Sequence, residues 1–260
     1  MSDYNRNANA RFGAGVSRAG SAELDQGLRA YMLGVYNNMA LGLAITGLVA
    51  FAVHLMAVSA VPVAGGAHIG SMYLTSLGVA LYASPLKWVV MLAPLGFIFF
   101  FSFRIESMSA ASARMMFFAF AATMGLSLSV VLLIFTGTSV ARAFFMTSAT
   151  FGALSIYGYT TKRDLTAMGT FMVMALFGLI IASVVNVFMQ SSMFQFALSI
   201  LSIGIFAGLT AWDTQSIKEM YFASDSHEVA AKKSIHGALH LYLDFINIFQ
   251  SLLSLAGDRN

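Results

Sequence analysis

The sequence predicts an all-α integral membrane protein with seven transmembrane helices. Its 260 residues are 58% hydrophobic and only 10% charged, whereas a soluble domain carries about 25% charged residues. Apolar runs also recur along the chain, and crossing the hydrocarbon core of a bilayer takes roughly 17–25 residues of helix. The seven expected spans are residues 31–57, 88–103, 115–135, 140–159, 166–188, 193–212 and 235–256.

The sequence also predicts the structure of two segments outside these runs. Residues 1–30 are polar and rich in Asn, Arg, Ser, Ala and Gly, which predicts a disordered cytoplasmic tail ahead of a membrane domain of residues 31–260. The connection between the first two spans, residues 59–86, is unusually long and half apolar. Loops of this length are often functional or partly structured. We expect either a short interfacial or re-entrant helix around residues 72–82 or a covering loop.

The distribution of basic residues predicts a cytoplasmic N-terminus. With that orientation, only Lys87, Arg142 and Arg259 of the fourteen Lys and Arg residues fall in outer segments, and cytoplasmic loops are the ones enriched in Lys and Arg. A fold with six spans and a re-entrant C-terminal segment would move only Arg259 to the inner side, so both folds stay open. Compact loops favour a bacterial inner membrane.

Composition also excludes some chemistries. The chain has no cysteine, which excludes disulfides, thiol catalysis and Cys-ligated metals. It shows no nucleotide-binding loop and no nucleophile motif, so we expect neither an enzyme nor a bound cofactor. The net charge of +3 comes from few residues and does not indicate a nucleic-acid partner.

A polar stripe runs along the last apolar segment. His236, His240, Asp244 and Asn247 fall within about 80° of one helix face. Polar groups on such a helix are expected to face the bundle interior or a water-filled path, so the stripe is a possible ion path. The two histidines lie near the inner end and also suit the headgroup region. Their spacing resembles a metal site, but a metalloprotease needs Glu where Gly237 stands.

A second acid lies at the inner end of the sixth run. Asp213 has an unfavourable position with respect to the helix dipole, and Arg104 at the inner end of the second run is expected to pair with it. If Asp213 and Asp244 approach each other, they would share a proton and bind calcium transiently. Asp244 lies about 13 Å along its helix from Ile235. The two acids therefore meet only if the last helix begins earlier or the sixth continues past Trp212.

Three stretches carry a family resemblance. They are TAWDTQSIKEMY from Thr210, LHLYLDFINIFQSLL from Leu239 and ALSIYGYTTKRDL from Ala153. With them, the sequence resembles a bacterial-type member of the Bax inhibitor-1 family, also called the transmembrane Bax inhibitor motif family. The resemblance covers nearly the whole chain after the N-terminal tail. Some relatives carry an acidic residue in the second span, and residues 88–103 contain none.

The resemblance implies both a fold and a function. The fold would have two layers of three helices around a central C-terminal helix. The function would be a pH-sensitive calcium leak governed by two aspartates, which by motif match are Asp213 and Asp244, with Arg104 as the basic latch. The partners would be the lipid bilayer, protons and permeating calcium. Because some bacterial relatives restrain a membrane-bound ATP-dependent protease, the alternative function is a regulatory protein that binds such a partner.

Overall fold

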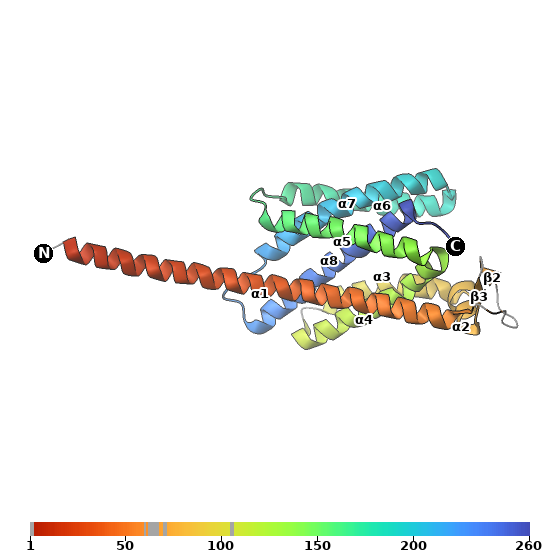
Figure 1. Cartoon of the computed structure of the whole chain (residues 1–260), viewed down its shortest axis with the longest axis horizontal. Helices are drawn as coiled ribbons and strands as arrows, with labels where there is room; N and C mark the ends of the chain where they lie inside the picture. Colours follow the sequence, from red (N-terminus) through yellow and green to blue (C-terminus); the bar gives the residue numbers. More distant parts are fainter. Residues whose placement is uncertain (1–2, 60, 62–67, 70–71, 105–106) are drawn as a thin grey trace.

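The protein is built from long helices, as the computed structural model shows for residues 3–59, 61, 68–69, 72–104 and 107–260 (Figure 1). The long helices are α1 (Asp3–Ala57), α3 (Leu86–Arg104), α4 (Ala110–Ile134), α5 (Gly137–Thr160), α6 (Thr166–Met189), α7 (Ser192–Glu219) and α8 (His227–Ala256). Six of the expected runs fall within one of these helices, and the third run, residues 115–135, extends one residue past the end of α4. The prediction of an all-α membrane protein is therefore confirmed.

Most of these helices are long and apolar enough to cross a bilayer. Among the described residues, five qualify: residues 26–57 of α1, and α4, α6, α7 and α8. A sixth span is present if α3 is counted together with the short helices before it, from which it is bent by 65°. The remaining long helix, α5, has 24 residues and is not among these candidates. The chain is a multi-pass membrane protein.

The connection after α1 contains strands as well as helix. The strands β1 (Val58–Ser59), β2 (His68–Ile69) and β3 (Met72–Leu74) form an antiparallel sheet in the order β1-β3-β2. The helix α2 (Ser76–Gly78) and the π-helical turn η1 (Val79–Ala83) follow. The expected short helix is thus present, but it begins later than predicted, because residues 72–74 form β3, which pairs with β1 and β2. Thr75 then starts α2 by accepting a hydrogen bond from Gly78 N.

A helix stands where the N-terminal tail was predicted to be disordered. α1 begins at Asp3 and continues to Ala57, and its first half extends beyond the other helices (Figure 1). The first proline of the chain is Pro62, so no residue of this type interrupts the helix. The division of the chain into a tail and a membrane domain at residue 30 stays a prediction.

Helix α8 packs against helices from both halves of the chain. α1 packs on α4 and α4 on α3, while α7 packs on α5 and α6, and α8 contacts α1, α4, α5 and α7 (Figure 1). Tyr242 of α8 is fully buried, and its ring lies 5.7 Å from the rings of both Phe117 and Phe120. Its hydroxyl is 2.7 Å from Thr46 Oγ1 of α1. The helix that carries the polar stripe is therefore anchored inside the bundle.

Candidate functional site

The two aspartates meet because both of their helices are longer than the sequence predicted. α7 continues past Trp212 to Glu219, and α8 begins at His227 instead of Ile235. Asp213 thus lies inside α7 and not at its end. Both acids face the interior, since Asp213 is 8% exposed and Asp244 is 4% exposed.

The two carboxyls interact directly. The groups acting on the Asp244 carboxyl are Asp213, through charge and a hydrogen bond, and the Thr210 side chain. Two carboxyls form a hydrogen bond only when one of them carries a proton. Oδ2 of Asp244 is buried and has no hydrogen-bond donor in the described part of the chain. Because an unpaired buried charge is costly, the site favours one shared proton or a bound cation.

His240 links the carboxyl pair to the outside of the bundle. Its Nδ1 lies 3.6 Å from Asp213 Oδ2, and its side chain is 47% exposed, compared with 11% for Asp213. The His236 ring packs edge-on against His240, with centroids 4.6 Å apart. A line of polar groups therefore runs from the buried Asp244 through Asp213 of α7 to the accessible imidazole of His240. Asn247 lies farther along α8 and donates to Leu243 O at 2.8 Å, so its amide is engaged by its own helix.

Arg104 does not contact Asp213 in this structure. It is exposed, and its guanidinium carbon lies 5.8 Å from the centroid of the Phe100 ring. Among the described residues, the ion-pair partner of Asp213 is His240. Arg104 ends α3, which packs against α4 and η1, whereas Asp213 belongs to α7. A latching role for Arg104 stays a prediction.

The structure also shows polar groups beside the pair that sequence reasoning missed. Tyr36 OH lies 2.6 Å from Ser155 Oγ, which lies 3.1 Å from Thr214 Oγ1. Thr214 in turn donates to Thr210 O at 2.8 Å. This hydroxyl chain joins α1, α5 and α7 next to Asp213. The i, i+4 spacing of Thr210 and Thr214 was the one signal in the sequence for it.

The C-terminal end of α7 is fixed by the α5–α6 loop and the end of α5. Gln215 accepts a hydrogen bond from Leu165 N at 2.8 Å and donates to Arg163 O at 2.9 Å. Lys218 Nζ donates to Tyr159 O at 2.9 Å. These contacts hold the turn of α7 that carries Asp213.

The pair supplies few ligands for a resident metal ion. In the part of the chain that the structure describes, no three or more His, Asp or Glu side chains converge on a metal position. Calcium takes about six to eight oxygen ligands, and Asp213 and Asp244 provide two carboxyls. A calcium ion at this position would need most of its oxygen ligands from elsewhere.

The fold and this site define a polytopic helical membrane protein with a buried carboxyl pair between its last two helices. Residues 28–260 match the family described as "Inhibitor of apoptosis-promoting Bax1". The chain belongs to this family, the Bax inhibitor-1 family.

Bacterial relatives share most of the length of the chain. An uncharacterised protein of Rickettsia prowazekii is 46% identical over 90% of this chain and 92% of its own. A protein of Caulobacter vibrioides is 39% identical over 99% of this chain and 98% of its own. The inner membrane protein YbhL of Escherichia coli strain K12 is 37% identical over 90% of this chain and 93% of its own.

Proposed function

We propose that this protein is a pH-sensitive calcium leak gated by the carboxyl pair Asp213–Asp244. The observation that supports the proposal most is the burial of the two acids against each other on adjacent helices. An ionisable group inside a membrane protein commonly marks an ion or proton pathway. Two such groups in contact form a coupled pair whose charge depends on pH.

The charge state of the pair would set the packing of α7 against α8. With one proton, the carboxyls share a hydrogen bond and hold the two helices together. With both carboxyls ionised, their repulsion is strong in the low-dielectric interior, which favours either separation of the helices or a cation between them. Calcium is a hard cation that carboxylate oxygens bind. Protons and calcium would therefore compete for one site, and each would bias a two-state packing.

His240 and Arg104 would modulate this equilibrium from the accessible side. A protonated His240 forms an ion pair with Asp213 across the 3.6 Å contact, which stabilises the Asp213 carboxylate. Arg104 would compete for the same carboxylate in a second arrangement of the helices. His236 and Asn247 would extend the polar path along α8.

Calcium efflux from proteoliposomes tests the proposal. We expect the wild-type rate to differ between acid and alkaline pH, and the Asp213→Asn and Asp244→Asn variants to lose that difference, because each removes one titrating carboxyl. Glu228→Gln is the matched control, since Glu228 is an exposed acid in the first turn of α8. Variants that leak with the wild-type pH dependence would exclude gating by the pair.

We further infer seven spans, arranged as two three-helix layers around α8, in a bacterial inner membrane with a cytoplasmic N-terminus. The uneven distribution of Lys and Arg supports this orientation, and the two chain ends lie toward opposite ends of the bundle (Figure 1). The relative named an inner membrane protein supports the location. Accessibility tags at the two termini should report opposite sides. Tags on the same side would favour six spans and a re-entrant segment.

The alternative function is regulation of a membrane partner such as a membrane-bound ATP-dependent protease. It is favoured by the first half of α1, which extends beyond the other helices (Figure 1). Deleting residues 1–25 should then abolish the effect on the protease while calcium efflux persists. If the deletion changed neither activity, the projecting helix would have no such role.

A further inference from the structure

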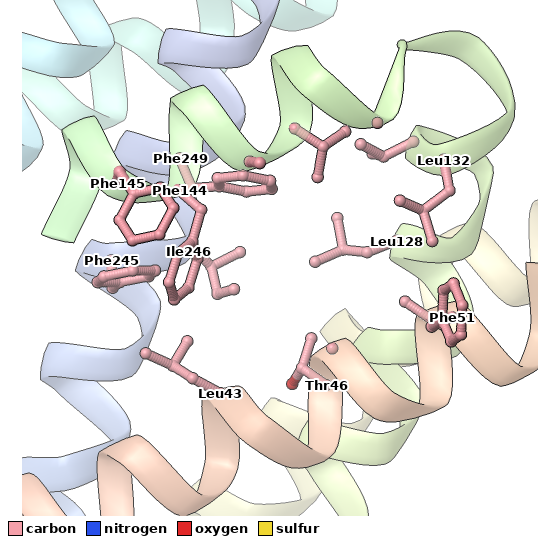
Figure 2. Close-up of a pocket in the computed structure, with 16 residues that line it drawn as sticks. Leu43, Thr46, Phe51, Leu128, Leu132, Phe144, Phe145, Phe245, Ile246 and Phe249 are labelled. Carbon is pink, nitrogen blue, oxygen red and sulfur yellow. The ribbon is translucent and has the colours of Figure 1, made fainter.

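An apolar cavity of about 360 Å³ lies between α1, α4, α5 and α8. Its volume is in the range of about 300–1,000 Å³ that is typical of small-molecule sites. Figure 2 shows Leu43 and Thr46 on one side, Leu128 and Leu132 on another, and Phe245 and Ile246 on a third, around an open centre. The cavity therefore borders the residue next to Asp244 without including the carboxyl pair.

The chemistry of the lining selects an apolar occupant. Thr46 has the one polar side chain among the lining residues, and its hydroxyl is already engaged by Gly42 O, Ala121 O and Tyr242 OH at 2.7–3.0 Å. An ordered water needs two to four polar partners, and apolar cavities stay dry. The lining offers neither a charge nor a free hydrogen-bonding group to a polar ligand.

The cavity is continuous with the surface that faces lipid. Its floor is buried, with Phe245 and Ile246 of α8 only 4% and 5% exposed. Other lining residues, which form its rim, are exposed: Phe51 of α1 is 56% exposed and Phe145 of α5 is 71% exposed. Both rim residues lie on long helices of a multi-pass membrane protein. The opening between α1 and α5 is therefore bordered by exposed aromatic side chains, which suit contact with hydrocarbon better than with water.

We propose that this cavity, the α1–α5 cavity, binds one acyl chain of a bilayer phospholipid. The chain enters between Phe51 and Phe145 and packs on Phe245 and Ile246, where it restores the dispersion contacts that an empty cavity lacks. The inference goes beyond the proposed calcium leak and does not depend on it. If the leak exists, the chain contacts α8 directly beside Asp244 and gives the bilayer a route to the gate.

Two glycines allow a matched test. A Cβ built at Gly47, which lines the cavity, meets no atom within 4 Å, and the same is true of Gly178 on α6. Gly47→Phe therefore fills the cavity, whereas Gly178→Phe places the same side chain in open space elsewhere. Each protein is reconstituted in nanodiscs with a phosphatidylcholine that carries a photoreactive diazirine on one acyl chain, and labelled peptides are mapped by mass spectrometry.

We expect wild type and Gly178→Phe to be labelled on the cavity-lining peptides of α1, α5 and α8, including buried Phe245 or Ile246. Gly47→Phe should lose this labelling severalfold while labelling of lipid-facing α6 is unchanged. Ala141→Leu, which narrows the cavity from α5, gives a second test if Gly47→Phe does not fold. Labelling confined to exposed residues would overturn the proposal. So would labelling of Phe245 or Ile246 that neither Gly47→Phe nor Ala141→Leu reduces.

Discussion

A single pair of hydroxyls shows how α8 is held inside the bundle. Tyr242 OH lies 2.7 Å from Thr46 Oγ1, and Thr46 also bonds to Gly42 O and Ala121 O. The two groups are not equivalent, because Thr46 keeps carbonyl partners when Tyr242 loses its hydroxyl. With Thr46 removed, the fully buried Tyr242 hydroxyl loses the partner that the structure gives it.

This asymmetry gives a prediction about stability in detergent. Tyr242→Phe should cost about 0.6 kcal/mol, the average for a side-chain hydrogen bond within a membrane protein. Thr46→Val should cost about 1–3 kcal/mol, because it leaves a buried donor unsatisfied. Thermal unfolding midpoints of the two variants check the order. A larger loss for Tyr242→Phe would contradict this account of the contact.

The contribution of Asp164 to the stability of the folded protein is expected to depend on pH. Its Oδ1 accepts a hydrogen bond from Thr166 N at 2.8 Å at the start of α6. Hydrogen bonds from the Thr166 side chain and backbone lower the pKa of the Asp164 carboxyl below its ordinary value of 3.8. A lowered pKa in the folded state stabilises the fold above the ordinary pKa, and this contribution is lost as the pH falls through the folded value.

Asp164→Ala should therefore lower the thermal midpoint at neutral pH, and the difference from wild type should shrink as the pH falls below 3.8. Asp164→Asn is the control, because it keeps an oxygen acceptor but loses the charge, so its deficit should be smaller. Thermal unfolding midpoints of the wild type and both variants, measured from neutral to acid pH, test this expectation. A deficit for Asp164→Ala that stays constant with pH would show that ionisation of Asp164 does not stabilise α6.

At the scale of elements, close approach between α5 and α7 sets the position of Asp213. A Cβ at Gly158 would clash with the carbonyl oxygen of Ala211, two residues before Asp213, whereas a Cβ at Gly152 on the same helix meets nothing within 4 Å. Small residues at such crossings let helix backbones approach closely in membranes. Local sequence does not show which glycine of α5 lies at the contact, because only the position of α7 distinguishes Gly158 from Gly152.

Gly158→Ala should therefore destabilise the protein and displace α7, whereas Gly152→Ala should be neutral or stabilise by up to about 1 kcal/mol through helix propensity. Thermal midpoints measure the stability, and the pH dependence of calcium efflux measures the displacement near Asp213. Equal effects of the two substitutions would show that the α5–α7 crossing tolerates a methyl group.

At the scale of the whole molecule, the chain end connects α8 to the α4–α5 turn. Asp258 O accepts from Thr136 N at 3.0 Å, and Asn260 N donates to Ile134 O at 2.9 Å. Ser139 N donates to Thr136 Oγ1 at 3.2 Å, while Asp258 N donates to Ser139 Oγ at 3.0 Å. The central helix is thus fixed at its end as well as by Tyr242.

Removing residues 258–260 should lower the thermal midpoint and loosen the end of α8, because several backbone groups of the α4–α5 turn lose their partners. Each net hydrogen bond contributes about 0.5–1.5 kcal/mol. Arg259→Ala is the matched control, since it keeps the backbone bonds and loses only the contact with the Phe135 ring. Hydrogen exchange should rise at residues 134–139 in the truncated protein alone. Unchanged exchange there would contradict the role of this contact.

The sequence by itself determined the membrane class and the approximate positions of the long helices, and it singled out the two acids. Hydrophobic run length reports directly on bilayer crossing, and Asp244 stands out in an apolar run whatever its neighbours are. The polar stripe followed from helical periodicity alone, and the structure keeps His236, His240 and Asp244 on one helix.

Only the tertiary structure decided which groups meet. The extension of α7 beyond Trp212 and the early start of α8 place Asp213 beside Asp244. Hydropathy did not predict these extensions because the added turns are polar and stabilised by packing and loop contacts. The contact between His240 and Asp213 and the α1–α5 cavity depend on how helices distant in sequence cross. Local sequence does not encode such crossings, because they depend on how side chains from several helices fit together in space.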